Sequence, residues 1–404
     1  MTAAARKTFV AAFLGWSLDA FDFFLLTFVV TRIATSFERG VAEVTFAITL
    51  TLLCRPLGAL LFGWLADRYG RRTPLMIDIG LYSILELLTA FSPNFTVFLV
   101  LRALYGVAMG GEWGLGAAMA MEALPPQRRG FFSGLLQEGY MFGYLLAALA
   151  YFAVFKFTPW GWRGLFVIGA LPAGLILYIR ASVPESPVWL ESRARQVTKA
   201  KNFLLLSLRA HWPLFLYGVA FMAALNAMSH GTQDLYATFL EKQHHFAPGQ
   251  TTTLSIIAAV GAIAGGVAFG TLSQRIGRRA VVMLCAMLAI CAIPLWAFSP
   301  TIPLLAAGAF AMQSVIQGAW GVIPAHLNEL SPAGVRATFP GFTYQLGNMV
   351  AAGTAQLEAT LAPHTSYAQA MALVLVVVLV AVVALSALGY LVRPENRHAA
   401  LQTT

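Results

Sequence analysis

Charged side chains interrupt several long apolar stretches of this sequence. Asp19, Asp22, Arg55 and Glu112 lie near the middle of such stretches, and Arg102, Glu138 and Asp234 lie off-centre. A charge in apolar surroundings is costly, so these residues are functional candidates. An arginine presents a planar fork of donors that matches a carboxylate, and an acid can take up and release a proton. The set is suited to binding an organic anion and to carrying protons.

A polar stripe runs through one apolar stretch in the second half of the chain. Asn226, Ser229, His230 and Gln233 recur at steps of three and four residues, which places them along one side of a helix. His230 and Asp234 are four residues apart and can touch. Lipid cannot hydrogen-bond such a stripe, so it must face protein or a water-filled cavity. The alternative for residues such as Ser229 is a hydrogen-bonded seam between helices.

The elements that must position these residues are membrane-spanning helices. Of 404 residues, 59% are hydrophobic and 11% are charged, against about 45–50% and about 25% in soluble domains. This composition excludes a soluble enzyme, a disordered regulator and a disulfide-stapled secreted domain. A spanning helix needs about 20 mostly apolar residues. Twelve stretches qualify, at 9–34, 44–66, 74–91, 94–122, 131–156, 163–181, 211–239, 251–273, 280–298, 301–328, 335–361 and 367–392.

Basic residues gather in alternate loops and set the predicted orientation. The positive-inside rule places the basic side in the cytoplasm, so both termini are expected to be cytoplasmic. The protein itself is expected in the cytoplasmic (inner) membrane. The net charge of +9 reflects this topology and does not indicate nucleic-acid binding. The residues on this side are Arg6, Lys7, Arg68, Arg71, Arg72, Arg128, Arg129, Arg193, Arg195, Lys199, Lys201, Arg275, Arg278, Arg279, Arg336, Arg393 and Arg397. The three cysteines all fall inside spans and indicate neither a disulfide nor a metal site.

An internal repeat relates the two halves of the chain. The segment GWLADRYGRR at 63–72 recurs as GTLSQRIGRR at 270–279, an offset of 207 residues. The same offset carries Gly111, Trp113, Gly114, Glu122 and Arg129 onto Gly318, Trp320, Gly321, Glu329 and Arg336. A shared offset at separate places predicts two six-helix bundles, at 1–181 and 211–404, joined by a cytoplasmic linker at 182–210. Two such halves with a site between them are a transporter architecture.

The repeated loop resembles the signature of the major facilitator superfamily. Arg102, followed by Gly106 and Gly110, resembles that superfamily's fourth-helix motif. The resemblance implies an all-α membrane protein of twelve transmembrane helices in two pseudo-symmetric six-helix halves, usually a monomer. Gln274 stands where the second loop copy would have its acid, so the two cytoplasmic gates are expected to differ in strength. The predicted gating residues are Asp67, Arg68, Arg71, Arg72 and Arg102.

The polar stripe carries a second resemblance. Residues 226–238, NAMSHGTQDLYAT, are similar to the NxxSHxxQDxxxT signature of Jen-type lactate/pyruvate:proton symporters, in the sialate:proton symporter family. The first span, GWSLDAFDFF at 15–24, also resembles that family. Gln345 and Asn348 match a polar pair that Jen-type transporters use in substrate recognition, and Arg55 matches their buried arginine. The resemblance implies a substrate site made of Arg55, Asn226, His230, Gln345 and Asn348.

Together these features predict proton-coupled symport of a small monocarboxylate of the lactate or pyruvate type. The proton-carrying candidates are Asp22, Glu112, Asp234 and Glu138, with Asp22 the first choice. One alternative is symport of sialic acid or another sugar acid, which a narrow cavity would disfavour. Another is an exporter with a proton-antiport cycle. An enzyme is not expected, because the sequence shows no nucleophile elbow, phosphate loop or metal-ligand spacing, and no cofactor is expected.

Overall fold

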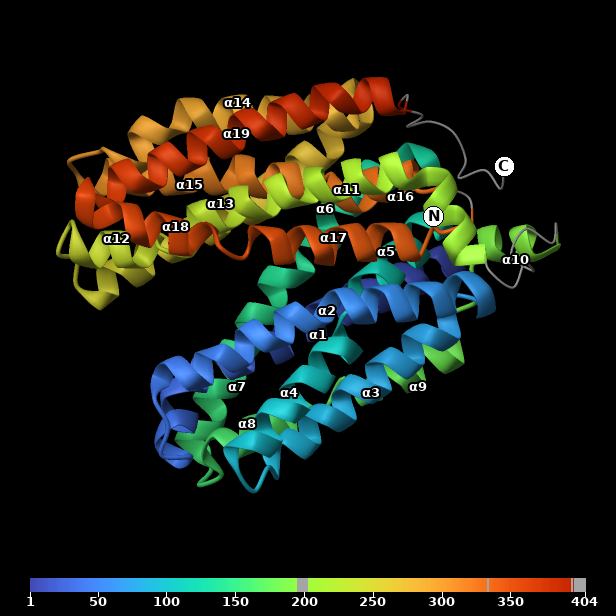
Figure 1. The fold of residues 1–404 in the computed structure, drawn as a ribbon, viewed down its shortest axis with the longest axis horizontal. Coiled ribbons are helices and arrows are strands. Elements are labelled where there is room, and N and C mark those ends of the chain that lie inside the picture. The colour runs from blue at the N-terminus through green and yellow to red at the C-terminus, as the bar shows by residue number, and fades with distance from the viewer. Residues whose placement is uncertain (195–202, 333, 394, 396–404) are drawn as a thin grey trace.

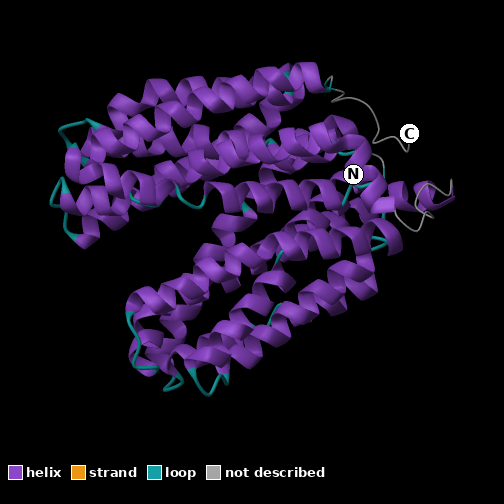
Figure 2. Ribbon diagram, in the orientation of Figure 1, coloured by secondary structure: helices purple, strands orange, loops and turns teal. Residues whose placement is uncertain are grey.

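The computed structural model describes residues 1–194, 203–332, 334–393 and 395, and these residues form helices and loops without any strand (Figure 2). A helix satisfies every backbone N–H and C=O within itself, which is what an apolar segment in a bilayer requires. The predicted all-α class is confirmed. The first half comprises α1 (Ala3–Ser36), α2 (Val41–Tyr69), α3 (Arg72–Ala90), α4 (Phe95–Met109), α5 (Glu112–Ala123), η1 (Pro126–Arg128), α6 (Arg129–Gln137), α7 (Gly139–Phe157), α8 (Gly161–Ile168) and α9 (Ala173–Ser182).

The second half repeats this plan after the short helix α10 (Pro187–Ala194). Its first helix begins at Phe203, inside the predicted linker, and is kinked at His211, two residues before Pro213. Residues 195–202 of that linker and Arg397 lie outside the described residues. The second half comprises α11 (Phe203–Gln233), α12 (Tyr236–Lys242), α13 (Pro248–Ile276), α14 (Arg278–Ala297), α15 (Ile302–Trp320), α16 (Ile323–Leu330), α17 (Thr338–Ala351), α18 (Thr354–Leu361), η2 (Ala362–His364) and α19 (Tyr367–Val392).

Eleven segments of the described chain are long and apolar enough to span a membrane, one fewer than the twelve predicted stretches. The missing one is 335–361, which a break at Ala352 and Gly353 divides into α17 and α18, each too short to span alone. Other spans are also pairs of helices placed end to end. Glu112 begins α5 after such a break, and Glu138 lies between α6 and α7. Breaks therefore occur where predicted functional acids lie.

The helices form two groups that meet at one end and diverge at the other (Figure 1). Helices α1–α9 make one group and α11–α19 the other, and the N-terminus lies near the end where they meet. That meeting end, where α2 ends beside Asp67, is called the Asp67 end below. The division follows the internal repeat, while the domain boundaries 1–181, 182–210 and 211–404 stay a prediction.

Glycines allow the two groups to touch at the Asp67 end. A Cβ on Gly134 of α6 would overlap the backbone oxygen of Gly266 on α13, and one on Gly130 would lie 2.5 Å from the oxygen of Gly270. A Cβ on Gly63 of α2 would lie 2.6 Å from the Cα of Thr338 on α17. Small residues thus bring α6 onto α13 and α2 onto α17. The structure is closed at this end.

We expect Gly134→Val to hinder closure at the Asp67 end without unfolding either group. The atoms nearest to a Cβ at this position all belong to the opposite group, so the variant should separate the groups and lower transport by at least about tenfold, the effect of ~1.4 kcal/mol. The measurement is the distance between spin labels on exposed Arg68 and Ile276, which belong to different groups. As a control, Gly58→Val overlaps Val107 within one group and should instead lower thermal stability, by about 1–3 kcal/mol. An unchanged label distance in Gly134→Val would contradict this prediction.

Candidate functional site

A cavity of about 610 Å³ lies between the two groups of helices. Its lining reaches Ile48 of α2 and Ser255 of α13, toward the ends of these helices that lie opposite the Asp67 end. Much of the wall is aromatic, and the ring of Trp113 behind it packs tilted against the cavity residue Tyr344, with ring centroids 4.5 Å apart. The aromatic lining residues are Trp16, Phe23, Phe24, Tyr140, Tyr144, Tyr236, Trp296, Trp320 and Tyr344.

The first group of helices contributes an ion pair to this cavity. Arg55 on α2 donates from Nη2 to Oδ2 of Asp19 on α1 at 2.7 Å, and both side chains are almost fully buried. Oδ1 of Asp19 and Nε of Arg55 have no hydrogen-bond partner among the described residues. Asp19 therefore uses only part of the donor fork of Arg55. An anion in the cavity can bind the remaining donors or replace Asp19.

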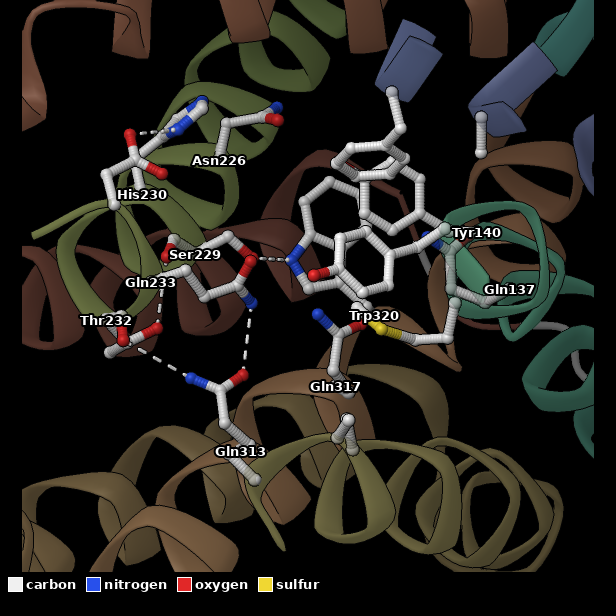
Figure 3. A pocket seen from close by; sticks show the side chains of 18 of the residues that line it. Gln137, Tyr140, Asn226, Ser229, His230, Thr232, Gln233, Gln313, Gln317 and Trp320 are labelled. Carbon is white, nitrogen blue, oxygen red and sulfur yellow. Dashed lines mark hydrogen bonds and ion pairs between the residues drawn. The ribbon is translucent and has the colours of Figure 1, made fainter. Parts of the chain in front are cut away.

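The second group contributes a histidine held on both sides. Nδ1 of His230 lies 2.9 Å from Oδ2 of Asp234, and Nε2 lies 3.0 Å from Oδ1 of Asn348 on α17. Asn226 lines the cavity on the same helix as His230 (Figure 3). Both partners are acceptors as they are oriented, so a doubly protonated ring satisfies both, whereas a neutral ring donates only once. Loss of a proton from His230 would therefore weaken the contact between α11 and α17.

Uncharged polar side chains of α11 and α15 also line the cavity (Figure 3). Nε2 of Gln233 donates to Oε1 of Gln313 at 3.0 Å, and Nε1 of Trp320 donates to Oγ of Ser229 at 2.6 Å. The polar stripe thus serves both uses considered from the sequence. It faces the cavity, and it forms a hydrogen-bonded seam with α15.

Two predicted proton-carrying acids are buried within the first group, behind the cavity wall. Both oxygens of Asp22 and both of Glu112 have no hydrogen-bond partner among the described residues, and neither side chain lines the cavity. Arg102, a predicted gating residue, donates to Oε2 of Glu86 at 2.6 Å and lies over the ring of Tyr105 at 3.8 Å. These contacts stay inside one group, so gating by Arg102 stays a prediction.

Two further predicted residues also lie off the cavity. Glu138 is 7% exposed, and its Oε1 lies where a Cβ on Gly266 would be. Glu138 therefore points from the α6–α7 break onto α13. Gln345 is 1% exposed, and neither polar atom of its side chain has a partner in the described part of the chain. Asn348 faces the cavity and Gln345 does not, so substrate binding by Gln345 stays a prediction.

Asp67 ties the two groups together at the closed end. Its Oδ1 accepts a hydrogen bond from the backbone N–H of Ala337 at 3.0 Å, and its Oδ2 accepts two from Thr338, at 3.0 and 2.7 Å. Thr338 begins α17, so the carboxylate lies at a positive helix end. Arg71 bonds Asp67 at 3.1 Å and Glu122 at 2.9 Å. The neighbouring predicted residues lie outside this buried network, because Arg68 is exposed and Arg72 donates to the Arg180 carbonyl.

The second copy of this loop makes a weaker contact. Gln274 accepts one hydrogen bond from the backbone N–H of Gly130 on α6, at 3.1 Å, and one from Arg278 of its own group at 3.0 Å. Charge-assisted hydrogen bonds are roughly twice as strong as neutral ones. That the two gates differ in strength stays a prediction, and the charged Asp67 is expected to be the stronger.

We expect Asp67→Asn to shift the protein toward conformations that are open at the Asp67 end. The amide keeps one acceptor oxygen but loses the charge and directs an N–H toward backbone donors. A hydrogen bond to a charged group contributes about 1.5–3 kcal/mol, so the population should shift by at least about tenfold. The Arg68–Ile276 label distance should lengthen, while Gln274→Ala should lengthen it less. An equal or larger effect of Gln274→Ala would contradict this ranking.

Three buried acids of the described chain are not among the residues predicted from the sequence. Asp78 and Glu86 lie on α3, and Glu358 lies on α18, all with no measurable exposure. Each falls inside a stretch identified as a span, at 74–91 or 335–361. The criterion that selected Asp19 and Asp22, a charge within an apolar run, would have found them too.

A cavity between two related helical groups, which hydrogen bonds of Asp67 and small residues hold together at one end, is the architecture of a membrane transporter. The chain belongs to the Major Facilitator Superfamily, whose family model matches residues 12–352 and 219–403. Members of this superfamily are transporters of small organic substrates rather than enzymes. The chain is therefore a multi-pass membrane transporter.

Similar proteins include several that are named as transporters of small organic molecules. A "Carboxylic acid transporter protein homolog" of Saccharomyces cerevisiae is 30% identical over 380 residues, which cover 88% of this chain and 61% of the relative. A "Probable 4-methylmuconolactone transporter" of Cupriavidus pinatubonensis is 28% identical, covering 98% and 92%. "Sialic acid transporter NanX" of Escherichia coli is 28% identical, covering 85% and 84%. The fold is that of the proton:xylose symporter XylE, with TM-score 0.75, 19% identity and coverage of 97% and 96%.

Proposed function

We propose that this transporter carries a small monocarboxylate of the lactate or pyruvate type together with a proton across the cytoplasmic membrane, with both termini cytoplasmic. One observation carries the proposal. Arg55 of one group and His230 of the other line the same cavity, and each is paired with an acid, Asp19 or Asp234. A cavity with a cation on each side suits an anion, and the acids beside the cations can take up protons.

The substrate carboxylate would bind the free donors of Arg55, because a guanidinium and a carboxylate match in geometry. Asn226, His230 and Asn348 lie on the other side of the cavity and would hydrogen-bond the hydroxyl or keto oxygen. A substrate that contacts both groups at once would stabilise an intermediate state in which the cavity is closed at both ends. Substrate binding would then favour the passage between the state open on one side of the membrane and the state open on the other.

Proton coupling follows from the charge of the site. With a carrier acid protonated, the net charge near Arg55 favours an anion. When the anion leaves, the proton can leave as well, and the empty site can reorient. One proton with one monoanion would be electroneutral. Asp22 is the first candidate for this carrier, followed by Glu112 and Asp234, and Glu138 is a further candidate.

A sugar acid such as sialic acid is the second candidate substrate, and the size of the cavity favours it. A narrow cavity would count against a sugar acid, but about 610 Å³ falls within the roughly 300–1,000 Å³ typical of pockets for drug-sized ligands. Gln313, Gln317 and Gln233 add amides that suit several hydroxyl groups. The E. coli relative is named as a sialic acid transporter, and the signature at 226–238 favours the smaller acids.

The deciding experiment is uptake of labelled L-lactate into proteoliposomes under an inward proton gradient, with and without an ionophore that collapses the gradient. Accumulation that disappears with the gradient would support proton–monocarboxylate symport. Accumulation of sialic acid but not lactate would select the second candidate. No uptake of any organic anion would contradict both and favour a proton-antiport exporter.

A further inference from the structure

One buried carboxyl group in the second half has no place in the cavity or the gate. Glu358 on α18 has no measurable exposure, and neither Oε1 nor Oε2 has a hydrogen-bond partner among the described residues. It does not line the cavity. An ionised carboxylate kept from water without donors is strongly disfavoured, and a proton removes that cost. This position therefore calls for a bound proton or a nearby cation.

The ionisable neighbours of Glu358 come from the end of α11 and the turn that follows it. A Cβ on Gly231 would lie 3.1 Å from Oε1 of Glu358, so this glycine leaves room for the carboxyl group against α11. His230, next to Gly231 on α11, and Asp234, which directly follows the end of α11, both interact electrostatically with Glu358. The other elements packed against α18 are α19 and η2. Helix α19 contains no Asp, Glu, Lys, Arg or His, and η2 ends at the exposed His364.

The charge of this three-residue cluster then depends on Glu358. A protonated His230 beside an ionised Asp234 is neutral as a pair, so an ionised Glu358 would leave the cluster with one negative charge. Asp234 and His230 face the cavity while Glu358 lies behind them. A negative cluster would repel an anion approaching His230, whereas a protonated Glu358 would not.

We propose that Glu358 is a proton-binding site of the second half and that its protonation favours anion binding beside His230. The link to anion binding rests on the proposed function, whereas proton binding by Glu358 does not. The site lies on α18, after the break that follows Asn348, so the proton occupies the same divided span that bonds His230. Proton binding and the α11–α17 contact would thus be coupled through one histidine.

The first test needs no substrate. Infrared difference spectra of the purified protein between acidic and alkaline pH should contain a carboxylic-acid carbonyl band that Glu358→Gln removes. Glutamine has nearly the shape of the protonated acid, so the variant should fold. Glu241→Gln, which alters an exposed acid of the same half, is the matched control and should leave that band unchanged. A band that is the same in Glu358→Gln and in the unmodified protein would overturn the proposal.

The second test measures linkage to the anion. Lactate binding is followed by the fluorescence of the cavity tryptophans, and its Kd should rise with pH. In Glu358→Gln the slope of log Kd against pH should fall by about one, which is a tenfold smaller change in Kd per pH unit and corresponds to the loss of one linked proton. Gly231→Ala should disturb the same slope, because its methyl group presses on Oε1. An unchanged slope in Glu358→Gln would overturn the link. If Glu358→Gln removes the infrared band but the unmodified protein binds no lactate, the proposed function would be contradicted and the proton-binding site would still be supported.

Discussion

Arg55→Ala should lower both proton-driven uptake and exchange of preloaded substrate by at least about 100-fold. The variant removes the only arginine among the lining residues of the described cavity and leaves Asp19 buried without its cation. Truncating one partner of a buried, hydrogen-bonded charge pair in a binding site costs about 2–5 kcal/mol of affinity, and about 2.8 kcal/mol already corresponds to 100-fold. Uptake and exchange are measured in proteoliposomes. Both should fall together, because binding precedes either process.

A loss of folding could imitate this result, so the control removes both charges. The double variant Arg55→Ala with Asp19→Asn leaves no unpaired buried charge and should recover thermal stability without recovering transport. Arg55→Lys keeps the charge but not the planar fork, so it should fall between Arg55→Ala and the unmodified protein. Transport by the double variant at more than a tenth of the normal rate would show that Arg55 is not the anion-binding residue.

Asp22→Asn should abolish accumulation of substrate under a proton gradient while exchange of preloaded substrate is retained. The amide imitates the protonated acid, so the cycle proceeds without needing or releasing a proton. Asp22 does not line the cavity, so substrate contacts should be preserved. With one proton per anion, a gradient of one pH unit supports about tenfold accumulation, and the variant should show none. Uptake with a gradient and exchange without one are compared in the same vesicles.

Variants of the other acids rank the remaining candidates. Glu112→Gln and Asp234→Asn should each weaken coupling less than Asp22→Asn. Asp234→Asn should also lower affinity, because Asp234 holds His230 at 2.9 Å. Equal loss of uptake and exchange in Asp22→Asn would point to binding or folding and would refute its role as proton carrier.

Local patterns in the sequence were enough for the class of fold and for contacts within one helix. The spans follow from runs of apolar residues, since the bilayer demands a minimum length. The repeat at 207 residues predicts two related groups of helices, which Figure 1 shows side by side. The contact of His230 with Asp234 follows from a spacing of four on a helix. These features depend only on helix geometry and on hydrophobicity, and both are determined by residues that lie close together in the sequence.

Contacts between distant segments were decided by the tertiary structure. Asp19, Asp22 and Glu112 are all acids within spans of the first half, and helix packing brings Asp19 to Arg55. The bond from His230 to Asn348 spans 118 residues, and that from Asp67 to Thr338 spans 271. The rotation of a helix about its axis and the positions of its breaks decide which side chains face a cavity. Those depend on packing between helices, so only the folded chain turns Asn348 toward the cavity and buries Glu358 behind it.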